Sequence, residues 1–433
     1  MSRPASRRTA KPRVGLALAG GGPLGAVYEI GALCALEEAI PGLDFNALDA
    51  YVGVSAGGFV AAGLANGMTP RQLCAAFIEN TGPSGDIVHP TLFFRPAWGE
   101  LLQRLATLPV QVARAGLAYA LGTRSLLAAV EALGRSLPTG VFTQAPLQAQ
   151  LQQMFCAPGR SDDFRALARR LVIVATDLDS GETAPFGLPG WDQVPISQAV
   201  AASAALPGLF PPLQINGRWY VDGALKKTLH ASVLLDMGLD LVLCLNPLVP
   251  FHAEPVGGRQ GSPRRHRLLA EGVAPIPQIV YGGLPLVLSQ TFRSLIHSRL
   301  ELGMRGYASS HRGTDILLFE PDQRDPALFL ANAFDTSQRR QLAEHAYQRT
   351  RAHLRSTRGS ISRSLARHGL VLDGTLLDQR RRRLLADHPR RRLTLPRFGV
   401  RAAVVPRSTA ASQALQRLDE VLNDLQRTLA AHG

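Results

Sequence analysis

Short apolar runs recur along the chain, and longer segments with helical spacing separate them. The runs cover residues 14–19, 50–55, 170–178, 219–225, 241–247 and 315–321. Runs that do not alternate with polar residues are typical of strands buried on both faces, and strands that alternate with helices predict a parallel sheet. Residues 26–39, for example, place Val27, Ile30 and Leu33 on one side of a helix. The pattern therefore predicts the α/β class, with a mainly parallel sheet sandwiched by helices.

Two stretches interrupt this alternation. Residues 83–150 read as an apolar helical insertion, which forms either a lid or lipid-contacting surface, or ordinary helices that complete the core. Residues 248–285 are rich in Pro, Gly and Arg and predict a long mobile loop. Both stretches are expected to lie within one domain that covers residues 14–350.

The formal net charge of +14 lies entirely in the two ends of the chain, whereas residues 14–350 are close to neutral. Residues 1–13 are expected to form a basic disordered tail, and residues 351–433 an Arg-rich, partly helical extension. In that extension leucines recur at steps of three and four, at positions 415, 418, 422, 425 and 429. Basic ends suit an anionic lipid surface or nucleic acid, and they are equally typical of solvated termini. We do not expect nucleic acid as a partner.

The four cysteines, Cys34, Cys74, Cys156 and Cys244, have neither the spacing of a zinc site nor that of a disulfide framework. We expect them to be small buried hydrophobic side chains. No run approaches the roughly 18 apolar residues that a membrane-spanning helix needs. The basic start of the chain lacks a clear cleavage site. We therefore expect a cytoplasmic protein that contacts membranes peripherally.

The glycine-rich stretch LALAGGGPLGAVYEIG fits two kinds of site. Gly20, Gly22 and Gly25 have the G-x-G-x-x-G spacing of a dinucleotide-binding turn. That site needs an acid about 20 residues on, after the second strand, to bind the ribose. The candidate acids, Asp44 and Asp49, precede the apolar run 50–55. We therefore interpret the glycines as an oxyanion loop, whose backbone N–H groups stabilise a tetrahedral intermediate.

The next apolar run ends in Gly53-Val54-Ser55-Ala56-Gly57, which is G-x-S-x-G between a predicted strand and a predicted helix. This is the context of a nucleophile elbow, a turn so tight that Gly53 and Gly57 leave room for the backbone while Ser55 presents its hydroxyl. A helix that starts directly after the serine favours negative charge at the reacting centre. Ser55 is therefore the candidate nucleophile.

A serine nucleophile needs a base, and the sequence offers an aspartate rather than a histidine. His230 and His89 are the nearest candidates among the histidines, but neither follows an apolar run. Asp222 ends the run 219–225 and is followed by Gly223 and Ala224, which leave space for a close approach. An ordinary Asp is too acidic for this role, so burial must raise its pKa. The alternative is a turn aspartate in an Asp-Gly pair.

The order of these motifs resembles the patatin-like phospholipases over about residues 14–350. G-G-G-x-x-G comes first, G-x-S-x-G follows about 30 residues later, and D-G-A lies well downstream. The segments IVATDLDSGE (173–182) and ASAALPGLFPP (202–212) are also similar to that family. Asp177, Ser203 and Pro207 lie in these segments and are expected to shape the pocket.

The resemblance implies an α/β fold with a Ser–Asp dyad and neither metal nor organic cofactor. Ser55 would be the nucleophile and Asp222 its base, in a D-G-A motif with Gly223 and Ala224. Gly20, Gly21, Gly22 and Gly25 would form the oxyanion loop. One departure is Pro23-Leu24, where the family usually has Arg or Lys before the last glycine of its first motif.

The sequence thus indicates a serine acyl hydrolase that cleaves ester bonds of phospholipids or related lipids at a membrane surface. Two alternatives remain at this stage. A transacylase or a soluble carboxylesterase would use the same site. A lipid-binding scaffold would keep the motifs around an idle or partner-dependent site.

Overall fold

A computed structural model describes residues 11–89, 91–92, 95–97, 110, 113, 138–252, 279–325, 328 and 336–385. These residues belong to one compact unit, which ends at Ala386. Most of the insertion expected at 83–150 and of the loop expected at 248–285 lies outside the described residues. The same holds for residues 1–10 of the basic tail and for the leucine repeat at 415–429.

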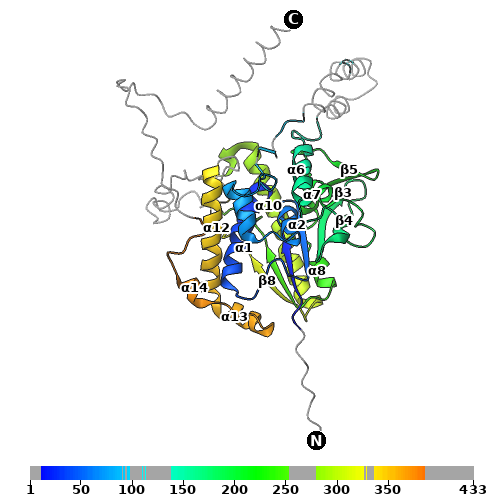
Figure 1. Cartoon of the computed structure of the whole chain (residues 1–433). Helices are drawn as coiled ribbons and strands as arrows, with labels where there is room; N and C mark the ends of the chain where they lie inside the picture. The colour runs from blue at the N-terminus through cyan, green and yellow to red at the C-terminus, as the bar shows by residue number, and fades with distance from the viewer. Residues whose placement is uncertain are drawn as a thin grey trace, which may run out of the picture. The chain divides into compact units, whose positions relative to one another are not determined.

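The described chain is built around one mixed sheet (Figure 1). Its strands are β1 (Val14–Leu18), β2 (Ala50–Val54), β3 (Arg170–Asp177), β4 (Thr183–Phe186), β5 (Leu213–Ile215), β6 (Arg218–Asp222), β7 (Leu241–Leu245) and β8 (Asp315–Phe319). The order is β5-β6-β3-β2-β1-β7-β8, and β4 pairs with β3. β3, β2, β1, β7 and β8 run parallel, whereas β4, β5 and β6 pair in antiparallel fashion.

All six predicted runs are strands, so the predicted α/β class is confirmed. The two strands that the pattern did not predict, β4 and β5, are only 4 and 3 residues long.

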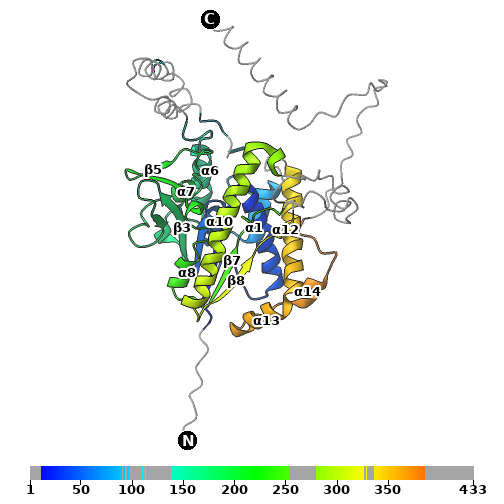
Figure 2. The same cartoon turned by 180° about the vertical axis from the view of Figure 1, so that it is seen from behind.

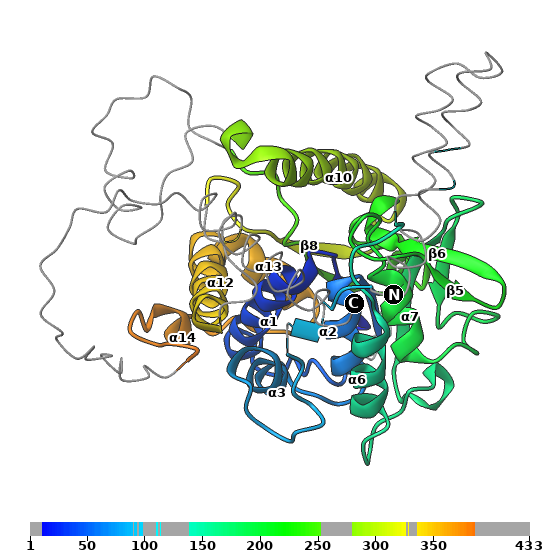
Figure 3. The same cartoon turned by 90° about the horizontal axis from the view of Figure 1, so that it is seen from above.

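Helices cover both faces of the sheet (Figure 3). α1 (Gly22–Ala39), α2 (Ala56–Ala65) and α12 (Thr336–Ser356) lie on one face, while α8 (Ser232–Asp236) and α10 (Gly283–Ser310) lie on the other (Figures 1 and 2). The remaining helical segments are α3 (Pro70–Leu73), η1 (Cys74–Glu79), α6 (Ala145–Phe155), η3 (Phe164–Ala166), α7 (Ile196–Ser203), η4 (Gly223–Leu225), η5 (Ile279–Gly282), α13 (Arg358–Arg367) and α14 (Gly374–Asp378).

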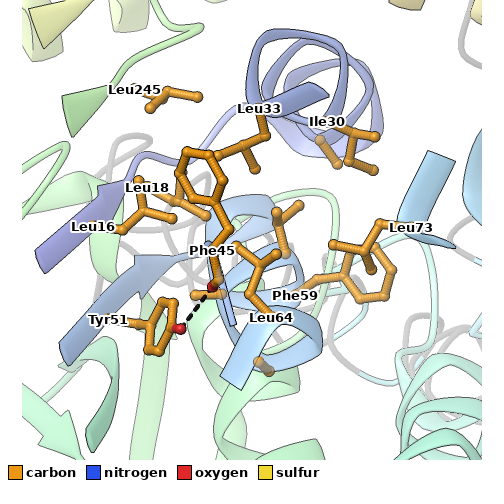
Figure 4. Close-up of a cluster of buried hydrophobic side chains, with 14 of the residues drawn as sticks. Leu16, Leu18, Ile30, Leu33, Phe45, Tyr51, Phe59, Leu64, Leu73 and Leu245 are labelled. Carbon is orange, nitrogen blue, oxygen red and sulfur yellow. Dashed lines mark hydrogen bonds between the residues drawn. The ribbon is translucent and has the colours of Figure 1, made fainter. Parts of the chain in front are cut away.

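The central strands bury side chains on both faces of the sheet. In β1, Leu16 and Leu18 belong to the core under α1 and α12, whereas Ala17 belongs to the core under α8 and α10. This explains why the strands read as unbroken apolar runs. Figure 4 shows Leu33 of α1 in the first of these cores, together with Tyr51, whose hydroxyl donates to the carbonyl oxygen of Phe45 at 2.7 Å.

Residues beyond 350 contribute to the same core. The division expected at 350 falls inside α12, and buried apolar side chains continue as far as Leu385. Arg351, only 2% exposed, donates to the carbonyl oxygens of Leu376 and Gln379 and to the hydroxyl of Tyr347. These bonds fix the chain around α14 against α12.

Three of the cysteines, Cys34, Cys74 and Cys244, are buried as expected. Cys156 is exposed, so the expectation was wrong for this residue. Its place explains the difference, because Cys156 is the C-cap of α6 and lies past the helix's buried face. Among the described helices, none is both long and apolar enough to cross a membrane.

Candidate active site

The register of the sheet brings Ser55 and Asp222 to the same level. Val54 of β2 pairs with Val174 of β3, so Ser55 follows beside Ala175. Asp222 pairs with Ala175 from the other side. The candidate nucleophile and base therefore flank a single strand, and adjacent strands lie only about 4.8 Å apart.

Ser55 occupies a strained turn between β2 and α2. Its φ of 53° lies in the left-handed region that few residues other than glycine adopt. A Cβ on Gly53 would lie 2.6 Å from the carbonyl oxygen of Gly57, and one on Gly57 would lie 2.5 Å from that of Ala19. Only glycine fits at these two positions, which is the constraint that a nucleophile elbow imposes.

Ser203, the last residue of α7, holds this elbow in place through two hydrogen bonds. It is fully buried, its hydroxyl accepts the backbone N–H of Ser55 at 2.7 Å, and it donates to the carbonyl oxygen of Val174 at 2.6 Å. One hydroxyl thus ties the strained turn to β3 through one backbone N–H and one backbone carbonyl oxygen.

Asp222 is 3% exposed at the end of β6. Burial raises the pKa of its carboxyl to about 6, whereas the Ala224 N–H and the nearby Ser55 hydroxyl lower it. The Ala224 N–H donates to Oδ1 at 2.8 Å. The carboxyl is therefore ionised at neutral pH and far more basic than an ordinary aspartate.

Gly223 allows this approach, because a Cβ there would collide with the carbonyl oxygen of Val174. β6 runs antiparallel to β3, so Asp222 reaches the site from a strand of opposite direction. The sequence predicted a strand end at Asp222 but not that direction.

The glycine loop leads directly into the N-terminus of α1. A Cβ on Gly20 would lie 3.2 Å from the Cβ atoms of both Ser55 and Ala224, so this glycine lies against the candidate dyad. Gly21 is the N-cap of α1, and Gly22 has a φ of +61°. In the part of the chain that the structure describes, the N–H groups of Gly20, Gly21 and Gly22 form no hydrogen bond with another group. They can therefore donate to a ligand at this helix end.

Gly25 differs from the other three glycines of the loop. Its N–H already donates to the carbonyl oxygen of Gly21 at 3.0 Å inside α1. A Cβ on Gly25 would lie 3.2 Å from Cγ of Pro247. Gly25 thus lets the segment after β7 close onto the loop, and its N–H is not available to an oxyanion.

The other candidate side chains, two histidines and an aspartate, are not placed to take part in catalysis. His230 is buried, and desolvation lowers its pKa to about 4, so its neutral ring donates from Nε2 to the carbonyl oxygen of Gly223 at 3.2 Å. His89 is exposed. Asp49 accepts the N–H of Val14 at the start of β1, the end of that strand opposite the glycine loop. An acid placed there does not suit a dinucleotide bound at the loop.

These observations agree with a comparison of the sequence with known families. A family model described as "Patatin-like phospholipase" matches residues 16–235, just over half of the chain. The chain belongs to the patatin-like phospholipase family. It is accordingly an enzyme of the lipid acyl hydrolase class.

Three solved structures are also similar to this patatin-like chain. VipD from Legionella pneumophila is 17% identical, with 80% of this chain and 67% of VipD covered and a TM-score of 0.34. The type III effector protein ExoU is 18% identical, with 80% and 53% covered and a TM-score of 0.32. ExoU in the heterodimeric complex with SpcU from Pseudomonas aeruginosa is 20% identical, with 67% and 52% covered and a TM-score of 0.23. The chain thus spans about half the length of ExoU, and the family assignment rests on the family model alone.

The patatin-like chain departs from its family at Pro23-Leu24, where a cation is usual. Leu24 is partly buried and packs against the core under α1. The first turn of α1 is therefore held by apolar contact at this position rather than by a charged side chain.

Asp177, in the family-like segment 173–182, has a structural role. Asp177 is 4% exposed and accepts the N–H groups of Asp179 and Ser180, and these bonds keep the pKa of its carboxyl below the usual range. It fixes the turn between β3 and β4. Pro207 is exposed in the turn after α7.

Sequence reasoning missed two groups of the site. Ser203 lies in a family-like segment, but its two hydrogen bonds depend on the fold, which brings the end of α7 next to the elbow. Ala56 is the first residue of α2, and within the described residues its N–H has no hydrogen-bond partner. The sequence signal for Ala56 is its place directly after the nucleophile in G-x-S-x-G, because the N–H of that residue faces the reacting centre in such elbows.

Proposed function

We propose that this enzyme hydrolyses ester bonds of phospholipids or related lipids with Ser55 as the nucleophile and Asp222 as its base. The observation that carries the proposal is the buried carboxyl of Asp222, which lies close enough to the Ser55 hydroxyl for that group to lower its pKa and whose pKa burial raises to about 6. A base with a pKa near the working pH accepts a proton efficiently and also returns it.

In the first half-reaction, Asp222 accepts the proton of the Ser55 hydroxyl while Oγ attacks the ester carbonyl carbon. The carbonyl oxygen becomes an oxyanion, and the N–H groups of Gly20, Gly21, Gly22 and Ala56 are the candidate donors to it. Each such donor lowers the barrier by roughly 3–4 kcal/mol. The intermediate then expels the alcohol of the lipid, which takes the proton from Asp222.

In the second half-reaction, Asp222 accepts a proton from water, which attacks the acyl group on Ser55. The intermediate collapses, the fatty acid leaves, and Ser55 recovers its proton from Asp222. The products are a free fatty acid and the deacylated lipid. We further propose that the reaction takes place at a membrane surface, which the enzyme contacts peripherally.

The test is release of fatty acid from phosphatidylcholine vesicles by the full chain. Ser55→Ala and Asp222→Asn should each reduce the rate by about 10³-fold or more, since the two groups act as a unit. The matched controls are Ser360→Ala and Asp179→Asn, which change an exposed serine and an exposed aspartate. Ser55→Ala with an unreduced rate would refute the proposal, and an acyl group found on an added alcohol rather than on water would show transfer instead of hydrolysis.

A further inference from the structure

Helix α10 carries an unusual row of exposed apolar side chains. Leu288, Phe292, Leu295 and Leu302 are 46%, 45%, 57% and 67% exposed. They are spaced by four, three and seven residues, so they share one face of the helix. We call these four residues the α10 stripe. The helix runs along the outside of the sheet, as Figure 2 shows, and its opposite side packs inward through Leu300.

α10 is bonded to the loops on both sides of the candidate active site. Towards its N-terminus, Gln290 bonds to both the N–H and the carbonyl oxygen of Phe251, and Arg293 donates to the carbonyl oxygen of Val249. These residues continue the segment whose Pro247 closes on the glycine loop.

In the middle of the helix, Arg299 donates to the carbonyl oxygen of Leu225, three residues after Asp222. The carbonyl oxygen of Ile296 accepts the hydroxyl of Thr228. The stripe is therefore carried by the helix that joins the oxyanion side of the site to the side of the base.

The charge beside the stripe favours an anionic partner. Arg299 lies within the same face, and Arg305 is highly exposed one turn beyond Leu302. Glu301 is the exposed acid of α10, and its carboxylate lies 3.9 Å from Arg305. A second copy of this helix would bring arginine against arginine, whereas anionic head groups would be attracted.

We propose that the α10 stripe docks the enzyme onto a lipid surface that contains anionic head groups. The inference rests on the proposed function, because it assigns that function's membrane contact to one helix. Amphipathic helices that bind in this way bury their apolar face at the head-group boundary while flanking arginines contact the lipid phosphates. Docked through α10, the enzyme keeps the loops around Ser55 and Asp222 next to the lipid that supplies its substrate.

The experiment compares the full chain with Phe292→Gln/Leu295→Gln, which removes apolar surface from the stripe without adding charge. The control is Val371→Gln, which changes an apolar side chain that is 67% exposed in the segment between α13 and α14. Each protein is tested for flotation with vesicles of equal parts phosphatidylcholine and phosphatidylglycerol. Fatty-acid release from these vesicles is compared with hydrolysis of a soluble short-chain ester.

We expect the stripe variant to bind vesicles at least about tenfold more weakly, because two large apolar side chains no longer enter the lipid. The ratio of vesicle hydrolysis to soluble-ester hydrolysis should fall by a similar factor, and Val371→Gln should leave binding and ratio unchanged. Unchanged flotation of the stripe variant would overturn the proposal. Stronger vesicle binding by the stripe variant would also overturn it, because this would show that the chain itself covers the stripe. A smaller oligomer of the stripe variant, with unchanged vesicle binding, would identify a second copy as the partner of the stripe.

Flotation of Ser55→Ala, with and without the two stripe substitutions, separates this inference from the proposed function. If the parent hydrolyses no ester but the stripe substitutions still weaken flotation, the dyad proposal fails and the docking surface stands.

Discussion

The raised pKa of Asp222 predicts that this residue reduces the stability of the fold at neutral pH. Its carboxyl is buried, and desolvation raises its pKa from 3.8 to about 6. The folded protein therefore holds a proton that the unfolded chain releases between these two values. The contribution of the carboxyl to the free energy of unfolding is complete below pH 3.8 and is lost as the pH rises through about 6.

The size of the loss follows from the shift. A rise of about two pKa units, at about 1.36 kcal/mol for each unit, corresponds to about 3 kcal/mol. Asp222→Asn removes the ionisable group and hence this loss. Between about pH 4 and pH 7, the variant should gain about 3 kcal/mol in the free energy of unfolding relative to the parent, while it loses hydrolytic activity. Such a loss of stability is the trade-off expected if Asp222 is the buried base of the proposed reaction.

Urea unfolding of the parent and of Asp222→Asn, at several pH values across this range, measures the difference directly. Asp177→Asn serves as a control of opposite sign, because hydrogen bonds lower the pKa of Asp177. Its carboxylate stabilises the fold fully above pH 3.8 and loses this effect only as the pH falls below that value. Asp177→Asn should therefore be less stable than the parent by a constant amount between about pH 4 and pH 7. A difference between the parent and Asp222→Asn that is the same at every pH would refute the reasoning.

Four further predictions concern the site and the core. The kcat/KM of the parent for a soluble ester should fall as the pH drops through about 6, because protonated Asp222 accepts no proton, and a flat profile would contradict this. Ser203→Ala should cost about 1–3 kcal/mol in urea unfolding and lower kcat more than it changes KM, since it leaves the Ser55 N–H without its partner. Gly57→Ala should destabilise by about 3 kcal/mol or more in the same assay, because its Cβ would meet the Ala19 carbonyl oxygen, whereas a fully active variant would refute the elbow geometry. Arg351→Leu should lower the free energy of unfolding by about 3–5 kcal/mol, since it breaks a buried network that holds α14. A smaller loss would show that residues beyond 350 contribute little to the core.

The sequence predicted the parts of the fold that have local signals. β1, β2, β3 and β7 stand out as apolar runs because they bury both faces, and α3 begins at Pro70 directly after the capping residue Thr69. β5 was missed because its 3 residues give no period, and the direction of β6 was missed because strand pairing is set by distant contacts.

The same distinction holds for the candidate site. Ser55 and the glycines around it are marked by tight-turn chemistry that the sequence displays. The support that Ser203 gives, the packing of Gly25 on Pro247 and the burial that raises the pKa of Asp222 depend on segments far apart in the sequence. No local pattern encodes such contacts, so only the folded arrangement reveals them.

The most direct test of the central claim is covalent labelling of the full chain with a fluorophosphonate probe, which reacts with activated serines. The parent should be labelled, Ser55→Ala should not, and Asp222→Asn should be labelled far more slowly, with all three folded as judged by circular dichroism. A parent that resists the probe, or labelling that persists in Ser55→Ala, would contradict the assignment of Ser55 and Asp222 as the catalytic pair.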